Sequence, residues 1–163
     1  MTSPSSEPST TPAPSSARPE APADAALFDA VAVEHGVIYG YGLVSAHSTP
    51  DANELVSTAM AEHRERREAA ITVLADRNVA APLPAPGYRL PTEVDSPADA
   101  ATLALRMEED SAVAWRAVLE QATTGEERKF AVTALTESAV TASQWRELIG
   151  TEPSTVAFPG GNE

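Results

Sequence analysis

The sequence predicts an all-α fold: a four-helix bundle made of two helical hairpins that a long proline-rich segment joins. Apolar residues recur at steps of three and four in four separate stretches of the chain, which is the period of helices that bury one face. A run of prolines between the second and third stretches excludes a continuous helix there. The 163 residues, 42% of them hydrophobic, are enough for one sizeable core.

The first hairpin is predicted to consist of a helix from Asp24 to about His47 and a second helix that ends near Asn78. The first helix has an apolar stripe of Leu27, Val31, Ile38 and Tyr41, and Glu34 lies inside that stripe. Thr49-Pro50-Asp51 is a start signal for the second helix, because a hydroxyl cap is followed by proline at the first helical position. The buried face of this second helix reads Val56, Met60, His63, Arg67, Ala70 and Leu74. The middle of that face is therefore polar.

The segment 79–95 contains Pro82, Pro84, Pro86 and Pro91 and is predicted to be extended. Seventeen residues at roughly 3.1 Å each would reach about 50 Å. A helix of some 27 residues is only about 40 Å long. The segment can therefore cross the full length of a bundle and join two hairpins, as one class of four-helix bundle requires.

The second hairpin begins with a capping box at Ser96-Pro97-Ala98-Asp99, which opens a helix to about Thr123. The stripe of this helix consists of Ala101, Leu105, Glu108, Ala112, Trp115 and Leu119. After Thr124-Gly125, a fourth helix is predicted from Glu126 to a glycine stop at Gly150. Its stripe consists of Phe130, Ala134, Glu137, Thr141 and Leu148. The bundle domain is accordingly predicted over residues 24–150, between a disordered Ser/Thr/Pro/Ala-rich tail (1–23) and a flexible tail (151–163).

Composition excludes several classes of function. A net charge of -13 and a pI near 4.5 disfavour binding to nucleic acid or to membranes. The chain has no cysteine, so any metal would be held by histidines and carboxylates. Neither a signal peptide nor a long apolar run is present, and the expected location is the cytoplasm.

Four glutamates lie near the middle of the four predicted helices. Glu34 precedes Glu62 by 28 residues, and Glu108 precedes Glu137 by 29. A carboxylate at mid-helix in a bundle is costly unless a cation, metal or proton compensates it. The near-repeat predicts that the four carboxyl groups lie at one level of the bundle.

Two short motifs give the chain a resemblance to a known family. Residues 34–42 read EHGVIYGYG and residues 63–68 read HRERRE, with Trp145-Arg146 near the end of the fourth helix as a further match. With these motifs the chain resembles an actinobacterial ferritin-like family of unassigned function. Ferritin-like di-metal proteins carry a lone Glu on two helices and Glu-x-x-His on the other two.

Carried over to this sequence, the resemblance matches Glu34 and Glu108 to the lone glutamates, and Glu62 and Glu137 to the first residues of the Glu-x-x-His pairs. Both histidines are replaced, because the corresponding positions hold Glu65 and Val140. His63 follows Glu62 directly and is rotated about 100° from it around the helix, so it does not simply substitute for the missing ligand.

Two hypotheses follow for these glutamates. In the first, the di-metal site is degenerate, and Arg67, one turn after His63, supplies the missing positive charge to a metal-free protein with a structural or interaction role. In the second, Glu34, Glu62, Glu108 and Glu137 bind Fe or Mn for oxidase-like or storage chemistry, with His63, Glu65 and Arg67 as neighbours. The sequence leaves open whether the protein is an enzyme and which protein partner it has.

Three glycines in the first helix, Gly36, Gly40 and Gly42, indicate close approach of another helix, either within the chain or across a homodimer interface. A weaker alternative is space for a small apolar ligand beside Glu34. The aromatic residues have two interpretations as well: core packing, or an electron-transfer route to a metal. These residues are Tyr39, Tyr41, Trp115 and Trp145.

Overall fold

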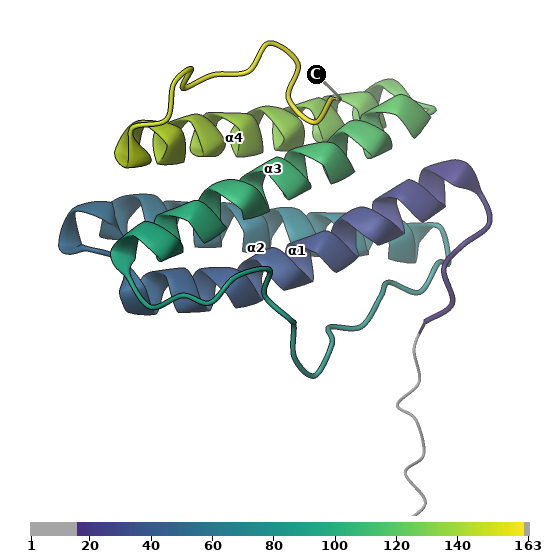
Figure 1. Cartoon of the computed structure of the whole chain (residues 1–163). Helices are drawn as coiled ribbons and strands as arrows, with labels where there is room; N and C mark the ends of the chain where they lie inside the picture. The colour runs from purple at the N-terminus through teal and green to yellow at the C-terminus, as the bar shows by residue number, and fades with distance from the viewer. Residues whose placement is uncertain (1–15, 162–163) are drawn as a thin grey trace, which may run out of the picture.

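The computed structural model describes residues 16–161 and contains four long helices, with no strand in that range. The helices are α1 (Pro22–His47), α2 (Asn53–Asp76), α3 (Pro97–Gln121) and α4 (Gly125–Ile149), and a short 3-10 turn η1 (Pro50–Ala52) leads into α2 (Figure 1). This confirms the prediction of an all-α, four-helix protein. Residues 1–15 and 162–163, which belong to the two predicted tails, lie outside the described residues.

Local side-chain chemistry explains where the second pair of helices begins and ends. The Ser96 hydroxyl accepts a hydrogen bond from the backbone N–H of Asp99 at the start of α3. At the start of α4, Thr124 and Glu127 form a reciprocal capping box. Gly150 ends α4 with a φ of 70°, a conformation that glycine adopts without steric cost.

The entry to α2 differs from the prediction. Thr49 makes no side-chain capping bond, and the chain first forms the 3-10 turn η1, so α2 begins at Asn53. Proline at Pro50 fits this turn because its missing N–H has no partner at a helix start.

The helices form two layers, one of α1 and α2 and the other of α3 and α4 (Figure 1). Among the packed pairs, α1 contacts both α2 and α3, and α3 contacts α4 most extensively. The contact between α2 and α4 is the sparsest of these pairs. One side of the bundle is therefore less closely packed than the others.

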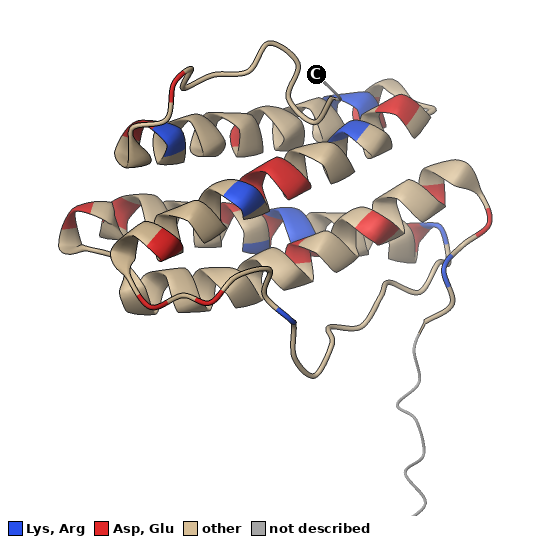
Figure 2. Ribbon diagram, in the orientation of Figure 1, with Lys and Arg blue, Asp and Glu red and all other residues tan. Residues whose placement is uncertain are grey.

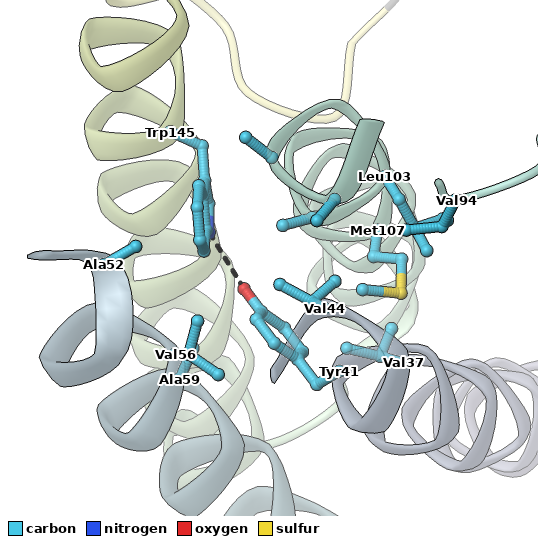
Figure 3. Close-up of a cluster of buried hydrophobic side chains, with 13 residues drawn as sticks. Val37, Tyr41, Val44, Ala52, Val56, Ala59, Val94, Leu103, Met107 and Trp145 are labelled. Atoms are coloured by element: carbon cyan, nitrogen blue, oxygen red, sulfur yellow. Dashed lines mark hydrogen bonds between the residues drawn. The ribbon is translucent and has the colours of Figure 1, made fainter. Parts of the chain in front are cut away.

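Two apolar clusters fill opposite ends of the bundle. The first includes Tyr41, Val44 and Trp145 (Figure 3), and the second includes Leu74 and Trp115. Trp115, Trp145 and Tyr41 are the largest fully buried side chains, whereas Tyr39 is 43% exposed. Between the clusters lies a layer of buried polar residues. They include Glu34, His63, Arg66, Glu108, Ser111 and Ser138.

The segment 77–96 connects α2 to α3 without forming a helix or strand. Its early residues Val79 and Ala81 pack against the second cluster, whereas Leu90 and Val94 belong with the first. Midway, the ring of Tyr88 lies 5.2 Å from that of Tyr39 on α1. The segment therefore links opposite ends of the bundle, so α2 and α3 point the same way, while α1 and α4 point the other way.

The C-terminal residues 151–161 return along α3 and α4 (Figure 1). A Cβ at Gly160 would lie 2.5 Å from the backbone oxygen of Ala112, so only glycine permits this close approach. Acidic positions occur on every helix (Figure 2). Across residues 16–161, none of the helices combines the length and apolar character that a bilayer crossing requires.

The three glycines of α1 have different surroundings. A Cβ at Gly40 would lie 2.2 Å from the Met107 sulfur of α3, so this glycine permits close approach of two helices within the chain. A Cβ added at Gly36 would lie 3.5 Å from the ring of Tyr88, which is an ordinary contact distance. A Cβ added at Gly42 would meet no described atom within 4 Å.

We expect Gly42→Ala to raise the free energy of unfolding by about 0.5–1 kcal/mol, because alanine is the better helix former and nothing obstructs its Cβ. Gly40→Ala serves as the matched variant: the same gain in propensity is offset by displacement of Met107, and we expect a loss of about 1 kcal/mol. Urea denaturation measures both variants. Equal stabilisation by the two alanines would show that the Met107 side chain moves aside without cost, contrary to this expectation.

Candidate functional site

A buried carboxylate, Glu34, lies in the middle of α1 and is 0% exposed. Its Oε1 accepts hydrogen bonds from the indole Nε1 of Trp115 at 2.7 Å and from the hydroxyl of Ser111 at 3.2 Å, both on α3. The same oxygen accepts a hydrogen bond from Nη1 of Arg66 on α2 at 3.3 Å. Side chains from two neighbouring helices thus converge on one carboxylate.

The imidazole of His63, on α2, lies between two carboxyl groups and contacts both. Its Nδ1 is 2.6 Å from Oε2 of Glu34, and its Nε2 is 3.0 Å from Oε1 of Glu108 on α3. All three residues are at most 1% exposed. Since both ring nitrogens can donate only when the ring is protonated, the geometry favours an imidazolium between two acceptors.

The pKa of His63 agrees with this geometry. Burial disfavours the charged ring, but the hydrogen bonds and charges of Glu108 and Glu34 outweigh burial and raise the pKa from 6.5 to about 9. For Glu34, burial likewise acts against the charged form. The hydrogen bond and charge of His63, together with Arg66 and Trp115, prevail and lower the pKa of the Glu34 carboxyl. The pair therefore holds opposite charges at neutral pH.

Glu108 extends the network toward the first apolar cluster. Its Oε1 accepts a hydrogen bond from the Tyr41 hydroxyl at 2.5 Å, and that hydroxyl accepts one from Nε1 of Trp145 at 3.0 Å (Figure 3). Burial, then the charge and hydrogen bond of Glu108, raise the pKa of Tyr41 well above 10, so Tyr41 remains a donor. The other oxygen of Glu108, Oε2, is buried and has no partner among the described residues.

Arg66 is the second cation of the site and is only 5% exposed. Besides Glu34, its Nη1 donates to the Ser138 hydroxyl at 2.8 Å, and its Nη2 donates to Oε2 of Glu137 at 3.1 Å. Its guanidinium carbon also lies 6.0 Å from the ring centroid of Trp115. Arg66 therefore ties α2 to α1, α3 and α4 at the level of the buried glutamates.

The structure corrects the predicted register of α2, in which Arg67 was the buried cation. Arg67 instead pairs with its neighbour Glu68 at 2.6 Å, and these side chains are 24% and 63% exposed. Positions three and four residues after His63 both lie on its side of the helix. The buried cation is the residue at the i+3 position, Arg66, because that position faces Glu34 and the serines of α3 and α4.

The four predicted glutamates do not share one environment. Glu34 and Glu108 are buried and joined by His63. Glu137 reaches the site only through Arg66, and its side chain is 42% exposed. Glu62 is partly exposed and makes no hydrogen bond or ion pair within residues 16–161. Glu65 is exposed.

Donor geometry limits what this site could hold. Among residues 16–161, no group of three or more His, Asp or Glu side chains is arranged so that it could hold a metal ion. The two buried carboxyl groups instead face an imidazole and a guanidinium. The arrangement pairs buried carboxyl groups with buried cations and connects side chains from the four helices.

The remaining histidines lie outside the site. His35 on α1 is within hydrogen-bond distance, 3.1 Å, of the Pro82 carbonyl. Burial lowers its pKa below the usual 6.5. His47 lies 3.0 Å from the carbonyl of Leu43 in the last turn of α1.

Sequence reasoning missed three members of the network. Arg66 was not included in the buried face of the second helix, and Ser111 and Ser138, which hydrogen-bond to each other at 3.1 Å, were not singled out. The sequence offered two signals for these serines. One is a small polar residue one turn after Glu108, and the other is a small polar residue directly after Glu137. Short hydroxyl side chains leave room for the guanidinium between the helices.

Comparison with known proteins places the chain in a family. A solved structure from Mycobacterium tuberculosis, "a conserved hypothetical protein, rv2844", is 55% identical, covers 80% of this chain and 98% of its own, and has a TM-score of 0.78. The comparison with curated proteins gives no match. The family described as "Domain of unknown function (DUF4439)" matches residues 26–163. Because that match extends from within α1 through the other three helices and the C-terminal segment, the chain belongs to the DUF4439 family.

Proposed function

We propose that this protein is a ferritin-like bundle in which two side-chain cations replace the di-metal centre, and that it acts as a metal-free structural or interaction module. The observation that carries this proposal is the position of His63, whose two ring nitrogens contact Glu34 and Glu108 at 2.6 and 3.0 Å. An imidazolium there occupies the space between the two carboxyl groups that a ferritin-like protein would offer to metal.

The residues present do not fit a di-metal centre. Three of the four oxygens of Glu34 and Glu108 are engaged by side-chain donors. The Arg66 guanidinium, 3.3 Å from Glu34, adds a permanent positive charge that opposes a second cation nearby. Glu62 and Glu137 lie on the less closely packed side of the bundle.

Topology supports the ferritin-like part of the proposal. Segment 77–96 runs from one end of the bundle to the other between α2 and α3, as a single long crossover does in ferritin-like folds. Glu34 and Glu108 occupy corresponding mid-helix positions on α1 and α3, the first helices of the two hairpins.

We expect the purified protein, incubated with excess ferrous iron or manganese under reducing conditions and then desalted, to retain far less than one metal ion per chain, because its carboxyl oxygens already accept hydrogen bonds from His63 and Arg66. Elemental analysis by mass spectrometry measures the metal, and thermal unfolding with and without chelator measures its effect on stability. The two unfolding curves should coincide.

Glu34→Ala and Glu108→Ala are the decisive variants, with Glu54→Ala, an exposed position on α2, as the matched control. Stoichiometric iron or manganese in the wild-type protein that disappears in both site variants and persists in the control would refute the metal-free proposal. That result would favour the Fe or Mn metalloprotein instead.

A further inference from the structure

The open side of the bundle, between α2 and α4, carries a continuous groove. Three adjoining hollows of about 410, 210 and 440 Å³ lie along it. The first two share Glu62, Thr133 and Glu137, and the last two share Ala69 and Phe130. We define this surface, from Leu55 and Gln144 at one end to Asp76 and Glu126 at the other, as the α2–α4 groove.

Among residues 16–161, the two segments outside the helices that follow α2 and α4 pack mainly on other sides of the bundle. Segment 77–96 packs over α1 through Tyr88, and residues 151–161 pack over α3 and α4. Apart from Arg77 at one end, no residue of 77–96 or 151–161 lines the α2–α4 groove. Along α2 the groove extends from Leu55 to Asp76, a length of roughly 30 Å at 1.5 Å per residue.

The groove walls are mostly small or apolar, with acid at the centre. On α4, Val132 and Val140 are 43% and 53% exposed. Glu62 and Glu137 face the middle of the groove, and the only cation lining that part, Arg66, is buried and committed to Glu34, Glu137 and Ser138. The partly buried carboxylate of Glu62 therefore makes no salt bridge within residues 16–161, and the charges of Arg66 and His63 act on it only from a distance.

Burial, then the charge of Glu137, raise the pKa of Glu62. Like charges at the centre of an apolar groove favour an occupant that brings a positive charge.

We propose that the α2–α4 groove docks an amphipathic helix of a partner protein, which lays apolar residues against Val132 and Val140 and places one Lys or Arg between Glu62 and Glu137. This inference rests on the proposed interaction role. A helix of about 20 residues matches a groove of this length. The overall charge of -13 attracts a basic partner over longer distances.

Two other occupants fit less well. A second copy of the chain would bring Glu62 and Glu137 toward their own symmetry mates, and like charges across a two-fold interface repel. Residues 1–15 of the chain contain no Lys or Arg, so they do not supply the positive charge.

The test uses a 20-residue synthetic helix with an apolar stripe and one central lysine, in buffer with chelator, and measures binding by fluorescence anisotropy and by amide chemical-shift mapping. We expect saturable binding, with shifts confined to the residues that line the groove. Replacing the peptide lysine with leucine, or Glu62 with glutamine, should each weaken binding about tenfold, and the double change should weaken it little further.

Matched controls distinguish binding in the α2–α4 groove from general electrostatic attraction to the acidic protein. Glu54→Gln removes the same charge from α2 outside the groove, and Leu83→Asp adds a charge at a 60% exposed leucine of segment 77–96. Both should bind as the wild type does, whereas Val140→Asp should abolish binding. Equal loss in Glu54→Gln and Glu62→Gln, or unchanged binding by Val140→Asp, would overturn the proposal.

A stable dimer in sedimentation that Val140→Asp dissociates would also overturn the proposal, in favour of a second copy. Because the assay contains chelator and does not depend on Glu34 or Glu108, its outcome is independent of the metal analysis. If the protein binds neither metal nor peptide, the docking proposal is refuted and the metal-free proposal is not.

Discussion

His63→Gln is expected to lower the free energy of unfolding by about 3–5 kcal/mol at pH 6. The substitution removes the buried cation that contacts Glu34 at 2.6 Å and Glu108 at 3.0 Å. Breaking a buried ion pair by removing one partner leaves the other charge uncompensated, and losses of this size follow. Glutamine is similar in size but carries no charge, and its donor hydrogens lie on a single nitrogen.

The pH dependence of stability distinguishes loss of charge from loss of packing. His63 has a pKa of about 9 in the folded protein against 6.5 for an ordinary histidine. A raised folded pKa gives a stabilisation that is complete below pH 6.5 and is lost as the pH rises toward 9. The difference between these two pKa values corresponds to about 3 kcal/mol of folding stability.

Urea denaturation at pH 6, 7, 8 and 9 measures this effect. Wild-type stability should fall across the series, while the stability of His63→Gln should be nearly constant over the same interval. His35 does not interfere, because burial lowers its pKa and its effect falls below pH 6.5. A wild-type protein whose stability is unchanged between pH 6.5 and 9 would exclude a charged His63.

At acidic pH, the dependence of folding stability on pH reflects Glu34. Burial acts against its charge, but His63, Arg66 and Trp115 lower its pKa, so its contribution is present above pH 4.5 and is lost as the pH falls through the folded pKa. The combined effect of His63 and Glu34 is a maximum of stability between about pH 4.5 and 6.5.

The sequence predicts the helices and the two buried glutamates well, because both follow from local patterns. A charged residue inside an apolar stripe is conspicuous, and Glu34 and Glu108 are the only glutamates of α1 and α3 that are buried. The cap at Ser96 and the stop at Gly150 depend on residues within a few positions of each helix end. Nothing from the rest of the fold is needed to predict them.

The rest of the site depends on distances between helices, which a periodic pattern does not contain. Arg66 and Arg67 both lie near the face of His63, and only the position of Glu34 across the bundle decides between them. Glu62 and Glu137 repeat the spacing of the buried pair. They remain partly exposed because α2 and α4 pack less closely than the other neighbouring helices.

Arg66→Leu and Arg67→Leu form a matched pair that tests the register of α2 directly. We expect Arg66→Leu to lower the free energy of unfolding by about 3–5 kcal/mol, because Glu34 loses a buried charge partner and Glu137 loses its ion pair. Arg67→Leu should change it by less than about 0.5 kcal/mol, because its pair with Glu68 is largely exposed.

Chemical denaturation, followed by tryptophan fluorescence, measures both variants in one experiment. Trp115 reports on the site, because its indole donates to Glu34 and its ring lies 6.0 Å from the Arg66 guanidinium carbon. The native emission spectrum should therefore change in Arg66→Leu and remain that of the wild type in Arg67→Leu.

If Arg66→Leu does not fold, Arg66→Lys keeps the test decisive. Lysine retains the charge but cannot donate to Glu34, Ser138 and Glu137 at once, so an intermediate loss of stability is expected. A larger loss in Arg67→Leu than in either Arg66 variant would show that Arg67 is the buried cation, because the residue that compensates Glu34 is the one whose removal leaves a buried charge unpaired.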